Sequence, residues 1–64
     1  PFEIGALCVP TPFFNDYWTG YWVVIAIKRD KHLQDVYITL HNMDNHRKIT
    51  LPHYDVGNYF VCIG

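Results

Sequence analysis

The chain has 64 residues, 50% of them hydrophobic and 17% aromatic, and a formal net charge of −1 with histidines neutral. A chain this short buries one small core, which excludes multi-domain enzymes and leaves little room for a supported catalytic cleft. The aromatic content excludes a disordered tail, and the charge is unlike that of a domain that binds nucleic acid through charge alone. We therefore expect residues 1–64 to form one folded domain that is not an enzyme and needs no cofactor.

Five short segments are predicted to be β-strands, some by alternation of apolar and polar residues with a period of two and others by their content of β-branched and aromatic residues. They are Ile4 to Val9, Tyr21 to Lys28, Val36 to His41, Lys48 to Leu51 and Tyr59 to Ile63. Turn residues separate them, and no segment has the length and period of a helix. Because closure removes exposed strand edges, we expect an all-β fold, a small five-stranded antiparallel SH3-like barrel. An OB-fold is the alternative.

The connection from Thr11 to Gly20 follows Pro10 and mixes turn residues with aromatic rings. Proline lacks the backbone donor of a strand ladder and restricts the residue before it, so we expect a long non-helical loop. Its rings either complete the core at one barrel end or offer a platform for a ligand, and they are Phe13, Phe14, Tyr17 and Trp18.

The second predicted strand is apolar on both of its faces. We expect the inward residues of the strands to include Trp22, Val24, Ala26, Val36, Ile38, Leu40, Ile49 and Leu51. Val23, Ile25 and Ile27 would then form an exposed apolar stripe. Such a stripe suggests cover by a second copy of the chain or by a flanking segment of a parent protein.

The cysteines and histidines show no metal-ligand spacing. Cys8 and Cys62 lie in the first and last predicted strands, where we expect two buried thiols, with a disulfide as the alternative. The histidines are expected to face solvent from strands and turns, and they are His32, His41, His46 and His53. Neither a metal site nor a catalytic constellation is predicted.

Three segments, in this order along the chain, resemble Tudor domains. Ile4 to Cys8 is similar to the Gly-x-x-Cys of the first Tudor strand, and Thr19 to Ile27 to the Gly-x-Trp-Tyr-Arg-Ala of the second. Leu40 to Asn45 resembles the Tudor turn Phe-x-Asp-Tyr-Gly-Asn. The resemblance implies an SH3-like barrel that binds peptides carrying methylated arginine or lysine in an aromatic box.

By this resemblance, the box lies at one barrel end, between the first-to-second and the third-to-fourth strand connections. Tyr21 and Trp22 would supply two walls, and Asn45 the amide that holds a guanidinium. The chain departs from the Tudor pattern where Leu40 and Met43 replace two rings. Asn42 also replaces a carboxylate.

Rings of the first connection can replace the missing walls. The predicted ligand-binding residues are therefore Phe14, Tyr17, Trp18, Tyr21, Trp22, Met43 and Asn45. We expect a non-enzymatic interaction module that docks a peptide or protein partner at this end, with a methylated arginine or lysine as a candidate ligand.

Two alternatives use other parts of the chain. A nucleic-acid-binding barrel would use the basic turns Lys28 to His32 and His46 to Lys48 together with stacking rings. A scaffold or homodimer would use the stripe of Val23, Ile25 and Ile27.

The sequence predicts no membrane span, because its longest apolar run, Trp22 to Ile27, is far shorter than the roughly 20 residues that cross a bilayer. It begins with Pro1 and carries no signal-peptide pattern. We therefore expect an excised segment of a larger protein, and the Tudor-like hypothesis assigns that protein to the inside of the cell, in the nucleus or the cytoplasm.

Overall fold

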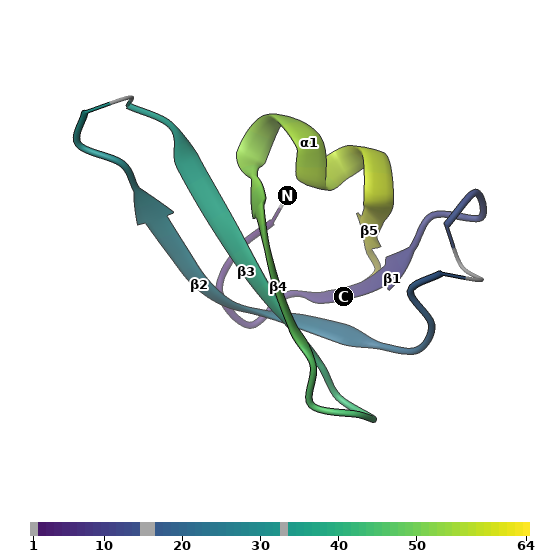
Figure 1. Ribbon diagram of the computed structural model, residues 1–64. Coiled ribbons are helices and arrows are strands. Elements are labelled where there is room, and N and C mark those ends of the chain that lie inside the picture. The colour runs from purple at the N-terminus through teal and green to yellow at the C-terminus, as the bar shows by residue number, and fades with distance from the viewer. Residues whose placement is uncertain (1, 15–16, 33) are drawn as a thin grey trace.

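Five strands and one helix make up the fold. The computed structural model describes residues 2–14, 17–32 and 34–64. The strands are β1 (Leu7–Pro10), β2 (Trp22–Arg29), β3 (Val36–Asn42), β4 (Lys48–Pro52) and β5 (Phe60–Cys62), and helix α1 (His53–Tyr59) connects β4 to β5. All neighbouring strands are antiparallel, in the order β4-β3-β2-β1-β5. The sheet curls strongly into a half-barrel, and α1 lies over its concave side (Figure 1). The predicted fold of five antiparallel β-strands is thus confirmed, and the fold is mostly β rather than all-β because of the short helix.

The first strand begins later than its alternation predicts. Gly5 has a φ of +92° and lies in a turn, so the ladder starts at Leu7 rather than Ile4. Pro10 belongs to the strand, opposite Phe60. The flanking residue Thr11 donates its N–H to Tyr59 O, so Pro10 occupies a position of the ladder that requires no donor.

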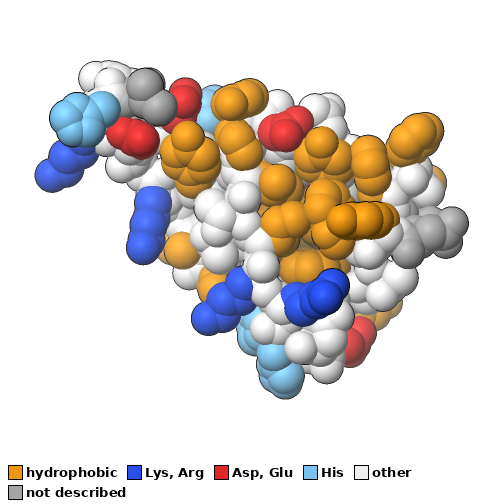
Figure 2. Space-filling view, viewed as in Figure 1, with side chains coloured by type: hydrophobic (Ala, Val, Ile, Leu, Met, Phe, Trp, Pro, Cys, Tyr) orange, Lys and Arg blue, Asp and Glu red, His pale blue; other side chains and the backbone are white. Residues whose placement is uncertain are grey.

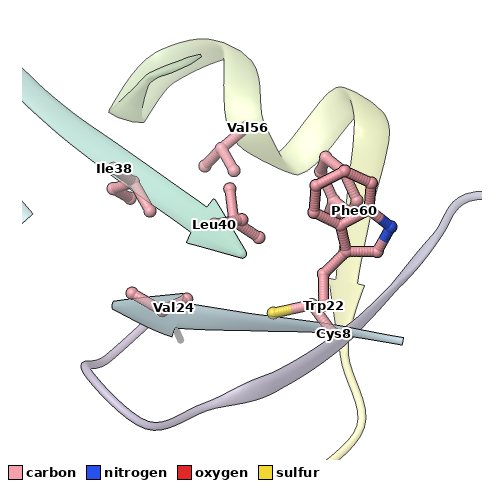
Figure 3. Packing of buried hydrophobic residues seen from close by; sticks show 7 residues of the cluster. All are labelled: Cys8, Trp22, Val24, Ile38, Leu40, Val56 and Phe60. Carbon is pink, nitrogen blue, oxygen red and sulfur yellow. The ribbon is translucent and has the colours of Figure 1, made fainter. Parts of the chain in front are cut away.

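The core lies between the concave face of the sheet and α1. Its buried apolar side chains are Cys8, Trp22, Val24, Ile38, Leu40, Val56 and Phe60 (Figure 3). Ile49 and Leu51 pack against this set while remaining partly exposed. The inward positions predicted on β3 and β4 are therefore largely confirmed, since alternation places one face of each strand against the helix.

A β-bulge in β2 overturns the prediction of an apolar stripe. Val24 pairs with Leu40 and Ala26 with Thr39, so Ile25 is an extra residue without a partner in the ladder. Beyond the bulge the alternation changes phase. Ile27 pairs with the buried Ile38, on the concave side, whereas Val23 faces the convex side. Val23, Ile25 and Ile27 therefore do not share one face, and Ala26 does not point into the core.

Helix α1 was not predicted from the sequence. It follows Pro52, whose φ of −60° and extended ψ end β4, and Asp55 lies in its first turn, where a carboxylate suits the positive end of the helix dipole. Only Val56 is fully buried, and Tyr59 packs against the core while partly exposed, so the helix has no long apolar stripe. No helix among the described residues is long and apolar enough to cross a membrane.

Candidate functional site

A chain of contacting rings joins the first connection to the C-terminal end of the fold. Trp18 stacks on Phe60 with ring centroids 5.4 Å apart, and Tyr59 meets it edge-on at 5.0 Å. Phe14 packs on Tyr59 at 4.6 Å. The rings of this aromatic cluster are Phe13, Phe14, Tyr17, Trp18, Trp22, Tyr59 and Phe60. Figure 2 shows hydrophobic side chains gathered over α1 and β5 on the face viewed.

The turn between β3 and β4 is held to the first connection by Asn42. Its side chain is 1% exposed, and its Oδ1 accepts the backbone N–H groups of Asp44 and Asn45 at 2.8 and 3.1 Å. Its Nδ2 donates to Thr19 O at 2.8 Å. Trp22 Nε1 donates to the same carbonyl at 3.2 Å. Because every polar atom of this buried amide has a partner, the turn and the connection are fixed relative to each other.

A surface pocket of about 340 Å³ opens where the first connection meets this turn. Its aromatic side is formed by Tyr17 and Trp18, whose rings meet edge-on at 5.2 Å with planes 78° apart. Tyr17 is 77% exposed and Trp18 partly buried. The described residues that line the pocket are Tyr17, Trp18, Thr19, Trp22, Asn42, Asn45, Arg47, Lys48 and Ile49.

The charge that borders this pocket is positive. Arg47 and Lys48 both line it and are exposed, and neither belongs to an ion pair among the described contacts. Asn45 Oδ1 accepts the backbone N–H of Arg47 at 2.9 Å, which fixes the backbone from which the guanidinium extends. No described lining residue carries a carboxylate. The pocket therefore combines ring surface, amide groups and two cations.

The structure brings together four of the seven predicted site residues, namely Tyr17, Trp18, Trp22 and Asn45. Trp22 is only 2% exposed, so it forms the floor of the pocket and part of the core rather than an accessible wall. Phe14 lies in the aromatic cluster without lining the pocket.

Tyr21 and Met43 lie apart from those four residues. They line a second pocket of about 400 Å³ together with Leu7 and Asp44. Tyr21 directly precedes β2, which begins at Trp22, and its ring lines a different pocket from that of Trp22. The structure thus places one of these two rings in each pocket, and the ligand-binding role that the Tudor resemblance implies for them stays a prediction.

Several residues of the candidate site escaped sequence reasoning. Arg47 and Lys48 lie in a basic turn, a pattern that indicates solvated charge, and only the fold shows that they line one pocket with Tyr17. His46 has a φ of +63°, and it turns the chain so that these two residues follow the pocket edge. Asn42 occupies the position of a Tudor carboxylate, which is the one signal that could have marked it.

The histidines and cysteines lie outside this site. His46 Nδ1 lies 3.2 Å from His41 Nε2 on an exposed surface. Among the residues that the structure describes, no group of three or more His, Cys, Asp or Glu side chains could hold a metal ion. Burial, followed by the hydrogen bond and the charge of Cys62, raises the pKa of Cys8 to about 12.

Comparison with known proteins finds no family model, no curated protein and no solved structure that matches this chain. The function of the site therefore has to be inferred from the residues that line it.

Proposed function

We propose that this chain is a non-enzymatic protein-interaction module that docks a peptide segment in the pocket between the first connection and the β3–β4 turn. The observation that carries the proposal is that the rings of Tyr17 and Trp18 line the same pocket as Arg47 and Lys48. A largely exposed aromatic ring gains from burial against a partner, and it loses little side-chain entropy on binding. Tyrosine, tryptophan and arginine are also the residue types that dominate binding energy at interfaces.

The lining chemistry favours a peptide that offers an aromatic or aliphatic side chain beside a carboxylate. The apolar side chain would pack on the rings of Tyr17 and Trp18. Arg47 can bind a carboxylate through two parallel N–H groups, and Lys48 adds a second positive charge. A methylated lysine or arginine fits less well, because two cations at the pocket edge would repel it.

The relation to Tudor domains belongs to this proposal. It is supported by the five curled antiparallel strands and by the place of the pocket, between the first-to-second and third-to-fourth strand connections. The ligand chemistry would differ from that of the family, because Leu40 is in the core and Asn42 holds the turn. We propose a Tudor-like module whose pocket has changed its preference from a cation to an acidic group.

Single-stranded nucleic acid is the second candidate partner. Its bases could stack on Tyr17, and its phosphates could pair with Arg47 and Lys48. The net charge of −1 disfavours binding of the negatively charged nucleic acid. The other basic residues, from Lys28 to Lys31, lie at the end of β2 and in the turn after it, beside the start of β3. The pocket lies at the other end of β3, which is seven residues and therefore roughly 20 Å long. Continuous phosphate contacts would need a basic groove along that distance.

An NMR titration of the isotopically labelled chain tests the proposal. The probes are a short peptide with one tyrosine flanked by glutamates, the same peptide with lysines in place of the glutamates, and arginine peptides with and without dimethylation. We expect saturable shifts at Tyr17, Trp18 and Arg47 with the acidic peptide only. If the dimethylarginine peptide alone binds, the charge argument is wrong; if no peptide binds, the peptide-docking function is rejected.

An oligothymidine probe separates the second candidate. Phosphate contacts make affinity fall steeply with salt, by a power of the salt concentration close to the number of phosphates neutralised. Binding of oligothymidine at the same resonances, lost between about 50 and 200 mM salt, would favour nucleic acid and contradict the peptide proposal.

A further inference from the structure

We propose that Cys8 and Cys62 form a reversible disulfide bond between β1 and β5, with a small-molecule disulfide such as oxidised glutathione as the oxidant. The two residues face each other across the antiparallel ladder, and their Sγ atoms lie 3.6 Å apart as thiols. The bond would make the outer strand β5 a covalent part of the sheet. Its formation is independent of the peptide-docking function.

The position of the pair in the ladder suits a disulfide. Ile63 donates its N–H to Leu7 O at 2.8 Å, and Thr11 donates to Tyr59 O at 2.8 Å. Hydrogen-bonded pairs alternate with non-hydrogen-bonded pairs in such a ladder, so Cys8 and Cys62 form a non-hydrogen-bonded pair. Side chains approach each other most closely at these positions.

The remaining movement is small. The S–S bond is about 2.05 Å long, so the sulfur atoms must approach by about 1.5 Å, which rotation of the two side chains about χ1 can supply. No strand needs to change its partner. Directly opposed residues in neighbouring strands also lie within the Cα separation that disulfides require.

The two thiols differ in accessibility, which orders the reaction. Cys8 is completely buried, whereas Cys62 is partly exposed and borders a pocket of about 530 Å³. The Cys62 thiolate would attack one sulfur of oxidised glutathione, and one glutathione thiolate leaves and takes up a proton. Deprotonated Cys8 then attacks Cys62 Sγ and releases the second glutathione. The protein loses two hydrogen atoms, and the oxidant is reduced to two glutathione molecules.

The raised pKa of Cys8 affects the second step. Burial keeps this thiol protonated, so little thiolate is present at neutral pH. The short distance between the two sulfur atoms offsets this, because the attack is intramolecular. We therefore expect the mixed disulfide on Cys62 to be transient and its lifetime to shorten as the pH rises.

The disulfide bond would strongly reduce the conformational freedom of the unfolded chain. The two cysteines are 54 positions apart in the sequence, so the bridge closes most of the chain into one loop. Closing such a loop removes entropy mainly from the unfolded state. The thermal unfolding midpoint should rise by roughly 10–20 °C for a domain of this size.

Incubation of the reduced chain with oxidised glutathione, followed by intact-mass measurement, tests the proposal. We expect a monomer whose mass has fallen by about 2 Da, no titratable thiol and a raised unfolding midpoint, all reversed by dithiothreitol. A persistent glutathione adduct on Cys62, a disulfide-linked dimer in dilute solution, or a chain that stays reduced would each overturn it. So would a bridged monomer with a lowered midpoint.

The variants Cys62→Ser and Cys8→Ser serve as controls. Cys62→Ser should resist the oxidant, because only the buried thiol remains. Cys8→Ser, if folded, should accumulate the glutathione adduct that the parent chain passes through. Equal rates of modification in the two variants would contradict the order of reaction proposed. The measurement on the parent chain remains decisive if Cys8→Ser does not fold.

Discussion

Trp18 lies flat against Phe60, with their ring planes 20° apart and their centroids separated by 5.4 Å. This contact joins the first connection to the first residue of the last strand. Phe60 is buried by α1 and by the strands of the core, so it presents a rigid surface to Trp18. The aromatic side of the candidate pocket is therefore positioned by the C-terminal end of the fold.

Replacing Trp18 should destabilise the whole domain. Trp18→Ala removes its contacts with Phe14, Tyr59 and Phe60, and large-to-small changes of this kind cost about 2–4 kcal/mol when the ring is only partly buried. Urea denaturation measures the loss. Phe13→Ala is the matched control: Phe13 is 88% exposed, and its loss should change stability by about 0.5 kcal/mol or less. Equal costs for both variants would show that the cluster does not anchor the connection.

Asn42→Asp should separate the two roles of the buried amide. A carboxylate can still accept the N–H groups of Asp44 and Asn45, but it cannot donate to Thr19 O. The buried charge would then face a carbonyl oxygen, and we expect a loss of about 2–4 kcal/mol. Asn45→Asp is the control, since its exposed side chain only accepts a hydrogen bond from Arg47 N. Urea denaturation that finds both variants equally stable would contradict the role of Asn42.

Gly57→Ala should stabilise the protein. Gly57 lies within α1, where its φ is not in the left-handed region, and a Cβ there would meet no atom within 4 Å. Alanine gains about 0.5–1 kcal/mol over glycine in a helix interior, which corresponds to a rise of several degrees in the unfolding midpoint. Gly20→Ala gives the opposite expectation. Its φ is +84°, and its Cβ would lie 2.6 Å from Asp44 Oδ2. Calorimetry of the two variants checks both signs.

Tyr17→Ala should weaken binding of the acidic peptide without unfolding the domain. The ring is largely exposed and contributes one edge-on contact with Trp18, so stability should change little. If Tyr17 is the main surface that the peptide covers, its loss should raise the Kd tenfold or more, about 1.4 kcal/mol. Calorimetric titration measures the effect. Phe13→Ala, at a ring that is also largely exposed but lies outside the pocket lining, should leave the Kd unchanged.

Stability of the reduced protein should fall at alkaline pH. Burial raises the pKa of Cys8 from 9.0 to about 12. Between these values the unfolded chain releases a proton that the folded chain retains, so each rise in pH favours unfolding. Urea denaturation at pH 8 and pH 10 measures the change, and Cys8→Ala should show a smaller decline. An identical decline in the variant would mean that other groups cause it.

The sequence predicts the strands more fully than the site. Alternation identifies β3 and β4 because each has one face against the core, as Ile38 and Leu40 show, and β-branched and aromatic residues identify β2. It fails for α1, since Gly57 is a weak helix former and only Val56 is fully buried. Its position over the concave face buries Val56 and packs Tyr59 on the core, and such tertiary packing supplies most of the stability of a short helix.

The candidate site was predictable only in part, because it too depends on tertiary structure. Tyr17 and Trp18 are recognisable as rings in a loop, but the residues they face depend on how the β3–β4 turn is folded. That turn is set by the buried hydrogen bonds of Asn42 and by the left-handed backbone of His46. The Tudor resemblance marks the position of Asn42, but no sequence pattern predicts its hydrogen bonds or the left-handed backbone of His46.

The bulge at Ile25 bends β2, but the pairing of β2 with β3 does not depend on it. Val24 and Ala26 face Leu40 and Thr39, which are themselves adjacent, so removing Ile25 would leave every remaining partner of β2 unchanged. What the extra residue adds is a local bend and a stronger twist. The curl of the sheet, which brings both outer strands towards α1, therefore depends on this one extra residue in β2. A chain without Ile25 should keep the pairing of β2 with β3 and have a flatter sheet.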